Sequence, residues 1–306
     1  MQVGFLHARI RQEEKLLLAE FESRGVEIAR IHIEDAPLPL EPSGRGAAYA
    51  GLDVVLERCI SHSRATAALR VFDGWGLPCV NPVRIADVCG DKLATNIALL
   101  SGGVPVPRAR VAFTPESALD AIEELGYPAV LKPAVGSWGR LLARVHDRET
   151  AESVLEHKAT LGSYHHSIFY VQEHIDKPGR DLRSFVVGDK VICAIARHSE
   201  HWITNTAKGS HVTPVDVTDE MREISLAAAA ACGGGILAVD LFETPNGLLV
   251  NEVNYTMEFK NSIHTTGVNI PAHIVDYVLQ VGEGRPVAPP ETVMSSAPSL
   301  APGARP

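Results

Sequence analysis

Two apolar segments in the C-terminal third, 237–243 and 247–253, are joined by a Pro-Asn-Gly turn at 245–247, and each carries a carboxylate among its apolar residues. Apolar segments joined by such a turn predict a β-hairpin. If the turn is centred on its asparagine, Asp240 and Glu252 are equidistant from the centre and therefore oppose each other, with Cβ atoms about 5 Å apart. Two like charges at that separation repel unless a cation lies between them. The pattern therefore predicts an antiparallel hairpin with a metal ion bound on one face.

Asn254 extends this candidate metal site. It lies two residues beyond Glu252 and so faces the same side of the strand. Mg²⁺ takes oxygen ligands, commonly one or two carboxylates together with substrate phosphates and waters. Asp240, Glu252 and Asn254 are therefore the predicted metal ligands. The alternative is a solvated hairpin face whose carboxylates are neutralised by lysines.

A possible phosphate site precedes the hairpin in the chain. Lys132 follows the apolar segment 128–131, and a lysine at the end of an apolar strand is costly to bury unless it meets an anion. The glycine-containing loop 135–140 comes next, and its backbone N–H groups can close over a phosphate. Lys92, at the start of a predicted helix, is a second candidate cation. Each feature alone fits an ordinary turn or surface lysine, but together with the hairpin they predict a nucleotide site. The sequence contains neither a P-loop motif nor a dinucleotide-binding glycine motif.

Polar residues between these two regions are expected to line a substrate pocket. Asp181 and Arg183 lie two residues apart and face the same way. Arg197 ends the next predicted strand, and the polar segment 201–209 follows it. The histidines resemble neither a zinc site nor a catalytic triad, so no role is assigned to them.

The first ninety residues predict a parallel α/β domain. Strands at 3–6, 26–33 and 52–56 alternate with helices at 11–24 and 65–75, and a proline- and glycine-rich loop spans 35–51. A β–α–β order of this kind is typical of a parallel sheet.

Two α+β lobes are expected after this domain. The predicted boundaries are 1–90, 91–167 and 168–283, followed by a Pro-, Ala- and Ser-rich tail at 284–306 that is expected to be disordered. Helices are predicted at 91–100, 114–125, 218–231 and 271–281, strands at 129–131 and 141–145, and hairpins at 185–195 and 237–253.

Composition excludes several classes of partner. The chain has 306 residues, of which 45% are hydrophobic, and a formal net charge of -9. That charge argues against a nucleic-acid or anionic-membrane partner, and no apolar run approaches the length of a membrane span. The five cysteines are widely spaced, and no pair has metal-ligand spacing. We therefore expect a globular cytoplasmic enzyme with reduced thiols.

With these residues in place, the chain resembles ATP-grasp ligases of the RimK/LysX group, and most closely the LysX branch. The resemblance extends from about residue 9 to residue 281. It is carried by Cys89-Gly90-Asp91-Lys92, Val130-Leu131-Lys132-Pro133 and Asn251-Glu252-Val253-Asn254, and by the segments 56–61, 136–140, 172–173, 178–183, 201–207 and 257–262. It implies an α+β ATP-grasp fold, in which an N-terminal parallel α/β domain is followed by two α+β lobes that clamp ATP.

The resemblance also implies roles for the matching residues. Lys92 and Lys132 would hold ATP phosphates beneath a loop made of Gly136, Ser137, Trp138, Gly139 and Arg140. The adenine, ribose and remaining nucleotide contacts would come from Gln172, Glu173, His174, Ile175, Asp181, Arg183 and Asn205. Asp240, Glu252 and Asn254 would bind two Mg²⁺ ions, and Arg197, Lys132 and Asn254 would act in catalysis. The substrates would meet Arg197, Thr206, Ala207, Lys208, Gly209, Glu258, Phe259, Lys260, Asn261 and Ser262.

The implied reaction needs no protein nucleophile. ATP would phosphorylate the side-chain carboxylate of the C-terminal glutamate of a small acidic amino-group carrier protein. The α-amino group of an amino acid would then attack the acyl phosphate, giving an amide, ADP and phosphate, in lysine or specialised amino-acid biosynthesis. An acidic carrier predicts a positive patch near Arg197, Lys208 and Lys260. A homodimer or homotetramer is expected.

The identity of the amino acid is left open. Asn261-Ser262 resembles the pair associated with α-aminoadipate, where glutamate-selecting relatives are expected to carry Gly-Phe. Departures from the group's pattern gather on the substrate side, at Ala8, His198, Lys208 and Tyr255. A related amino acid is therefore also possible. The alternatives are a RimK-type ligase that adds glutamate to a protein tail and a non-catalytic nucleotide-binding module.

Overall fold

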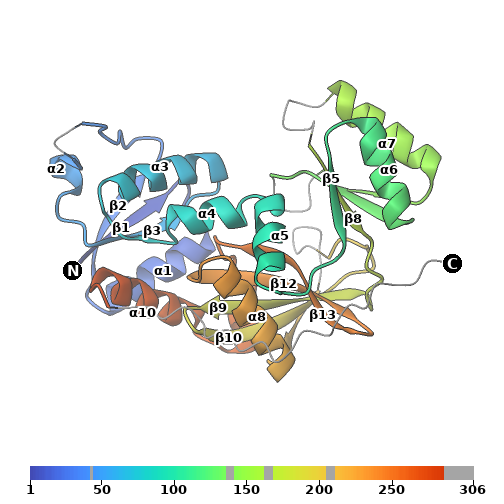
Figure 1. Ribbon diagram of the computed structural model, residues 1–306. Helices are drawn as coiled ribbons and strands as arrows, with labels where there is room; N and C mark the ends of the chain where they lie inside the picture. Colours follow the sequence, from blue (N-terminus) through green and yellow to red (C-terminus); the bar gives the residue numbers. More distant parts are fainter. Residues whose placement is uncertain (42–43, 136–140, 162–167, 205–210, 286–306) are drawn as a thin grey trace.

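The computed structural model describes residues 1–41, 44–135, 141–161, 168–204 and 211–285. Within this part of the chain there are three sheets, one for each predicted domain (Figure 1). The predicted loop at 136–140, the segment 205–209 and the tail beyond residue 285 lie outside the described residues.

The N-terminal domain is the predicted parallel α/β unit. It comprises β1 (Gln2–His7), α1 (Gln12–Ser23), β2 (Glu27–His32), α2 (Gly46–Tyr49), β3 (Val54–Arg58), α3 (His62–Gly74), β4 (Cys79–Val80) and α4 (Val83–Cys89). Its strands are parallel and follow the order β2-β1-β3-β4. The segment 35–51, predicted as a loop throughout, contains the short helix α2. The strand β4 and the helix α4 were not predicted.

The central sheet is antiparallel and follows the order β5-β8-β6-β7. Its elements are β5 (Ala109–Ala112), α6 (Pro115–Leu125), β6 (Ala129–Lys132), β7 (Ala143–Val145), α7 (Arg148–Leu161) and β8 (Phe169–Glu173). The strand β8 falls in the segment that the sequence analysis assigns to the start of the third lobe, but it pairs with β5 and β6. This sheet has a hydrophobic core of its own, which includes Ile122, Leu155 and Phe169.

The C-terminal sheet follows the order β11-β10-β9-β12-β13. Its strands are β9 (Arg180–Val187), β10 (Lys190–His198), β11 (His211–Val215), β12 (Ile236–Thr244) and β13 (Gly247–Asn254), and the helices of this lobe are α5 (Lys92–Ser101), α8 (Asp219–Ala231), α9 (Lys260–Thr266) and α10 (Ile270–Gly282). One face of the sheet packs on the alanine-rich face of α8. The hairpin β9–β10 turns at Gly188-Asp189 as predicted.

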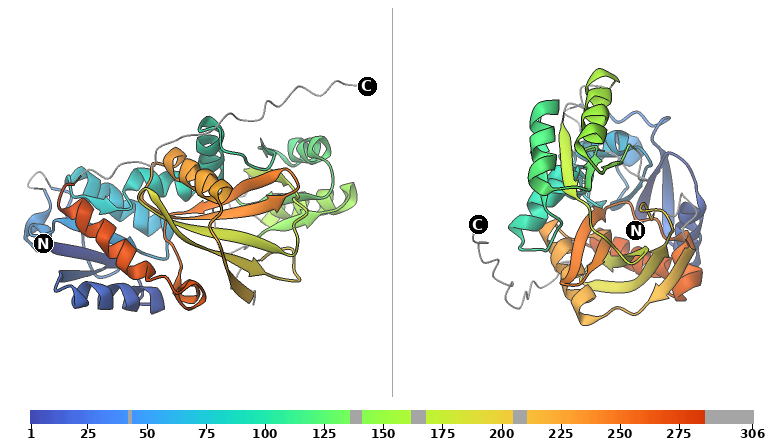
Figure 2. Two further views of the ribbon diagram at one scale, coloured as in Figure 1. Left: turned by 90° about the horizontal axis from the view of Figure 1, so that it is seen from below. Right: turned by 90° about the vertical axis from the view of Figure 1, so that its right-hand side faces the viewer.

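The other face of this sheet shares a core with the N-terminal domain. Phe185 and Ile236 of the sheet belong to the same buried cluster as Phe5 and Leu17 of the N-terminal domain and Ile274 of α10. The chain thus returns in α10 to pack beside α1, and the left view of Figure 2 shows these red and blue helices next to each other. The N-terminal domain and the C-terminal sheet are therefore parts of one packed body.

The register of the β12–β13 hairpin sets the position of the predicted metal ligands. Asp240 opposes Glu252, as predicted, but the turn is not centred on Asn246. Thr244 pairs with Gly247, so a regular ladder would place Asn251 opposite Asp240. A bulge next to Asp240 inserts one residue and brings Glu252 into that position.

Candidate active site

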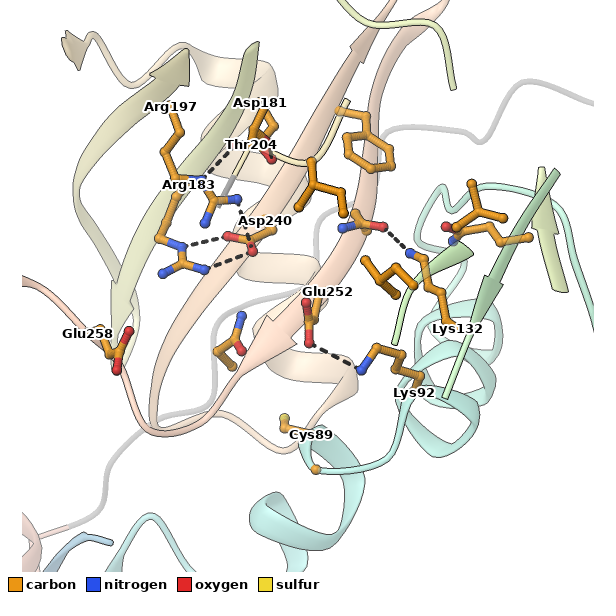
Figure 3. A pocket seen from close by; sticks show the side chains of 18 of the residues that line it. Cys89, Lys92, Lys132, Asp181, Arg183, Arg197, Thr204, Asp240, Glu252 and Glu258 are labelled. Carbon is orange, nitrogen blue, oxygen red and sulfur yellow. Dashed lines mark hydrogen bonds and ion pairs between the residues drawn. The ribbon is translucent and has the colours of Figure 1, made fainter. Parts of the chain in front are cut away.

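A cavity of about 410 Å³ lies where the three parts of the molecule meet. Its walls include Lys132 of the central sheet, Asp240 and Glu252 of the C-terminal sheet, and Arg11 of the N-terminal domain. Figure 3 shows the side chains of Lys132, Asp240 and Glu252 facing the same space. The volume falls in the range of about 300–1,000 Å³ that is typical of small-molecule sites.

Two lysines form one wall of the cavity. The Nζ atom of Lys132 donates to Oδ1 of Asn251 at 2.8 Å, and the Nζ atom of Lys92 lies 3.6 Å from Oε1 of Glu252 (Figure 3). The lysines are brought together because the backbone N–H of Lys92 donates to the carbonyl of Ala134, just beyond β6. Both ammonium groups therefore lie against the β12–β13 hairpin. Their role as phosphate-binding cations stays a prediction.

Lys132 is electrostatically strained without an anion. Burial lowers the pKa of Lys132 to about 8, and the neighbouring ammonium of Lys92 acts in the same direction, while Glu252 opposes the change. A bound phosphate would favour the charged form and remove much of this cost. The chemistry of this wall thus matches an anionic ligand.

Two arginines surround the carboxylate of Asp240. Arg183 binds it with two hydrogen bonds, from Nε to Oδ1 at 2.6 Å and from Nη2 to Oδ2 at 2.8 Å. Nη2 of Arg197 lies 3.1 Å from Oδ2, and Nε of Arg197 donates to Oδ1 of Asp181 at 2.7 Å. Burial raises the pKa of Asp240, but the two arginines outweigh it and hold that pKa well below its usual range. Asp240 is therefore ionised.

The three predicted metal ligands, Asp240, Glu252 and Asn254, all line the cavity, and each carries a side-chain oxygen of the kind that Mg²⁺ takes. Glu252 has a carboxylate whose contact with Lys92 is longer than a hydrogen bond. The side-chain amide of Asn254 is buried, and its Nδ2 finds no hydrogen-bond partner among the described residues. No cluster of three or more His, Cys, Asp or Glu side chains suited to a metal occurs in the described ranges, so the donor set is two carboxylates and an amide. A metal bound to Asp240 would share that carboxylate with both Arg183 and Arg197.

The predicted nucleotide-base end of the cavity is lined by consecutive residues at the end of β8 and beyond it, namely Gln172, Glu173, His174 and Ile175. Val130, Leu142 and Trp202 add apolar surface. Asp181 also lines the cavity, but its carboxylate is engaged by Arg197 and Thr204, with Nζ of Lys177 at 3.6 Å. Asn205 lies outside the described residues.

The predicted substrate residues divide into groups. Glu258 lines the cavity, whereas Phe259 is buried in the shared core and Ser262 is buried on α9. Lys260 and Asn261 are exposed, and none of these four residues from 259 to 262 lines the cavity. Thr206, Ala207, Lys208 and Gly209 lie outside the described residues, as do Gly136, Ser137, Trp138, Gly139 and Arg140.

Arg197 does not belong to a positive surface patch, contrary to the sequence analysis. Its side chain is only 6% exposed, and it is neutralised by Asp181 and Asp240. At this position the structure has a buried network of ion pairs instead of the expected patch. It joins Asp181 and Arg183 of β9, Arg197 of β10 and Asp240 of β12.

Several residues of the cavity were not assigned roles from the sequence. Asn251 receives the hydrogen bond of Lys132, and Lys177 approaches Asp181. Arg11, His62 and Tyr255 reach the cavity from or against the N-terminal domain. Asn251 lies in the segment 251–254 that carried the family resemblance. It is the extra residue of the bulge, which the sequence did not predict. Arg11 lies more than 200 residues before the hairpin in the sequence, and no local sequence pattern predicts that both line the same cavity.

Two α+β lobes enclose a cavity in which two lysines lie beside the carboxylates of the β12–β13 hairpin, an arrangement that fits an ATP-dependent ligase of the ATP-grasp class. Comparison with known proteins agrees. Residues 89–278 match the RimK-like ATP-grasp domain, and residues 3–88 match the LysX preATP-grasp domain. The chain belongs to the RimK-like ATP-grasp family, whose members use ATP and Mg²⁺.

This chain aligns with nearly the whole length of two curated relatives. The α-aminoadipate–LysW ligase LysX of Sulfolobus acidocaldarius is 36% identical over 87% of this chain and 97% of the relative. The glutamate–LysW ligase ArgX of Sulfurisphaera tokodaii is 32% identical over 91% of this chain and 98% of the relative.

Solved structures share the fold. The RimK domain ATP-grasp protein of Sphaerobacter thermophilus superposes with a TM-score of 0.76 at 28% identity, over 91% of this chain and all of that one. The ATP-grasp ligase PsnB, solved with minimal precursor, Mg and ADP, gives a TM-score of 0.69 at 17% identity over 92% of this chain and 97% of that one.

All five cysteines, each within the described residues, are free thiols. Among the described helices, none has the length and apolar character needed to cross a membrane.

Proposed function

We propose that this protein joins the α-amino group of an amino acid to the side-chain carboxylate of the C-terminal glutamate of a small acidic amino-group carrier protein. The observation that carries the proposal is the cavity in which Lys92 and Lys132 lie against the β12–β13 hairpin, next to Glu252 and Asn251, with the buried Arg197 beside Asp240. Relatives at 31–36% identity are named as ligases for the carrier LysW, which supports a carrier as the acceptor.

Different residues of the cavity would bind the phosphates, the adenine and the metal in such a reaction. Lys92 and Lys132 would bind the phosphates of ATP, and Gln172 to Ile175 would face the adenine. Asp240, Glu252 and Asn254 would hold Mg²⁺, with two ions as the proposed number. The metal would neutralise phosphate charge while the phosphoryl group moves to the carrier carboxylate.

Arg197 would act after this transfer. Its guanidinium lies in the buried wall beside Asp240. A fixed buried cation stabilises negative charge that develops on an acyl phosphate when an amine attacks it. No side chain needs to act as a nucleophile.

The amino acid is proposed to be α-aminoadipate or a related amino acid. The similarity to LysX and to ArgX is nearly equal, at 36% and 32% identity. Asn261-Ser262, which favoured α-aminoadipate, does not line the cavity, so selection by these two residues remains a proposal. The pathway is proposed to be lysine or specialised amino-acid biosynthesis. A cytoplasmic site of action and a dimer or tetramer remain predictions.

The test combines the protein with ATP, Mg²⁺, a LysW-type carrier ending in glutamate, and a panel of amino acids. The intact mass of the carrier should rise by one amino-acid residue with α-aminoadipate or a close relative. No mass gain with any amino acid would overturn the proposed function. Glu252→Gln should abolish the mass gain while retaining the wild-type circular dichroism spectrum. Arg110→Gln is the matched control, since Arg110 pairs with Glu124 on the surface of the central lobe.

A further inference from the structure

Arg11 lies in the cavity wall, where one edge of its guanidinium binds Glu14 and the other faces Glu258. Its side chain begins at the N-terminal end of α1 and lines the same cavity as Lys132 and Arg197. Nε donates to Oε2 of Glu14 at 3.0 Å and Nη2 donates to Oε1 at 2.9 Å. This bidentate pair uses the Nε/Nη2 edge and fixes the plane of the guanidinium. The Nη1/Nη2 edge points away from Glu14.

Glu14 is a rigid anchor for that plane. Its side chain is fully buried, and it also accepts from Nε of Arg58 at 3.0 Å and from the backbone N–H of Arg11 at 2.9 Å. Burial raises the pKa of Glu14, but the two arginines outweigh it and lower that pKa. The carboxylate is therefore ionised, and Arg11 is oriented before any ligand arrives.

Glu258 binds the Nη1/Nη2 edge of Arg11 in this structure. Nη1 of Arg11 donates to Oε1 of Glu258 at 2.8 Å, and the Glu258 side chain is 38% exposed. The backbone around Glu258 is tied to the N-terminal domain on both sides. Thr256 donates to Glu57 at 3.1 Å, and the backbone N–H of Lys260 lies 3.4 Å from Glu13. The main chain is thus held in place while the Glu258 carboxylate is partly open to solvent.

We propose that Arg11 and Glu258 together bind the zwitterionic head group of the amino-acid substrate. The α-carboxylate takes the Nη1/Nη2 edge of Arg11, where Glu258 now binds, and the α-ammonium takes the displaced Glu258 carboxylate. This subsite rests on the proposed function and names the residues that receive the amine donor. One internal ion pair opens, and two ion pairs with the ligand replace it.

The geometry favours an amino acid over other anions at this position. A planar fork with a fixed plane matches the two oxygens of a carboxylate. The adjacent carboxylate of Glu258 repels a second anion but attracts an ammonium. An α-amino acid carries both charges on neighbouring groups, and it is the substrate of the proposed reaction whose amine must enter the cavity.

The experiment measures carrier ligation with the amino acid that the wild type accepts, α-aminoadipate or glutamate. For Arg11→Gln, the KM of the amino acid should rise about 10- to 100-fold, the loss expected for a charged hydrogen-bonded pair. The KM of ATP should stay within about twofold of the wild type. Glu258→Gln should raise the KM of the amino acid in the same way. Arg24→Gln is the matched control, because Arg24 forms ion pairs at the opposite end of α1.

Substrate analogues distinguish a binding role from a structural one. Replacing the α-carboxylate by a carboxamide should raise KM for the wild type but cause little further loss in Arg11→Gln, because the partner is already missing. Replacing the side-chain carboxylate should give the same relative loss in both proteins. If Arg11→Gln instead couples to the side-chain carboxylate, or raises the KM of ATP equally, the assignment is wrong.

The outcomes separate this subsite from the proposed function. A wild type that ligates an amino acid, with Arg11→Gln unchanged in the KM of that amino acid, overturns the subsite alone. A wild type that ligates neither amino acid overturns the proposed function and the subsite with it. Arg11→Lys serves if Arg11→Gln fails to fold, since it keeps the charge and loses the fork. Its expected effect on the KM of the amino acid is smaller but in the same direction.

Discussion

Lys132 illustrates how a residue can reduce stability and still serve binding. Its ammonium is buried and donates a hydrogen bond to the neutral oxygen of Asn251. Of its charged neighbours, Glu252 favours the charged form of Lys132 and Lys92 disfavours it. The ligand-free protein therefore bears the cost of a buried cation that its ligand is expected to relieve.

Replacing Lys132 with methionine should separate these two effects. We expect Lys132→Met to raise the Tm of the ligand-free protein by about 2–4 °C, a gain of about 1 kcal/mol, because the buried charge is removed. The rise in Tm caused by ATP and Mg²⁺ should be lost. Differential scanning fluorimetry with and without ATP measures both.

Lys158→Met is the control for this prediction. Burial lowers the pKa of Lys158 as well, and its Nζ has no hydrogen-bond partner among the described residues, but it lies over Phe169 away from the cavity. This variant should keep the full response to ATP. An ATP response that survives in Lys132→Met would contradict the phosphate assignment.

The pH dependence follows from the same residue. The folded ligand-free protein releases the Lys132 proton near pH 8, whereas the unfolded chain keeps it to about 10.5. The unfolded state therefore binds more protons between these values, and this group makes stability rise with pH across that window. ATP affinity should fall over the same window, because the neutral amine binds phosphate poorly. Calorimetric titrations from pH 7 to pH 9 should show this fall in the wild type and a flatter profile in Lys132→Arg.

At the residue scale, the sequence predicted the site residues whose neighbours in the chain already show an unusual environment. Lys132 and Asp240 stand out because each is a charge beside an apolar strand. Phe259 and Ser262 could not be placed in this way, since only the packing of α9 shows that they are buried. The contact between Arg11 and Glu258 joins residues that are 247 positions apart, and nothing in either local sequence predicts it.

Among the elements, the β12–β13 hairpin shows what strand pairing contributes to the site. The bulge brings Glu252 opposite Asp240, and the side-chain oxygen of the neighbouring Asn251 accepts a hydrogen bond from Lys132. We expect Asn251→Ala to raise the KM of ATP about 5- to 10-fold, the effect of one hydrogen bond to a charged group. Steady-state kinetics measures it. Asn246→Ala, at the exposed turn of the same hairpin, should leave the KM of ATP unchanged.

Elements with strong local signals were predicted, and those that depend on tertiary packing were not. The helix α6 begins at Thr114, whose hydroxyl accepts from the N–H of Ser117, and this cap was visible in the sequence. The helix α9 and the strand β11 are short, and they are stabilised by packing against each other and against β10. The pairing of Asp240 with Glu252 was predicted correctly, but the turn centre assumed for it was wrong. Between the turn and the bulge the strands pair one residue out of the predicted register.

On the scale of the whole molecule, two separate cores predict two responses to core truncation. Leu155→Ala lies in the core of the central sheet, and Ile274→Ala lies in the core shared by the N-terminal domain and the C-terminal sheet. Each should cost about 2–5 kcal/mol. Hydrogen exchange followed by mass spectrometry should show increased exchange confined to 109–173 for the first variant.

The second variant should increase exchange in β1 and in β9 together, although these strands lie far apart in the sequence. Increased exchange in only one of the two would contradict a shared core. Ser63→Ala, at an exposed position of α3, is the control for both variants. It alters no core cluster and should leave both regions at the wild-type rate.

The shared core also bears on how such a chain can be recombined. Residues 3–88 and 89–278 match two separate families, as if they were exchangeable units. Yet Phe5 and Leu17 from the first segment pack with Phe185 and Ile274 from the second. A chimera that exchanges only the first segment would join surfaces that were never selected together. A functional graft should therefore carry α10 and the sheet face beneath it along with the N-terminal domain.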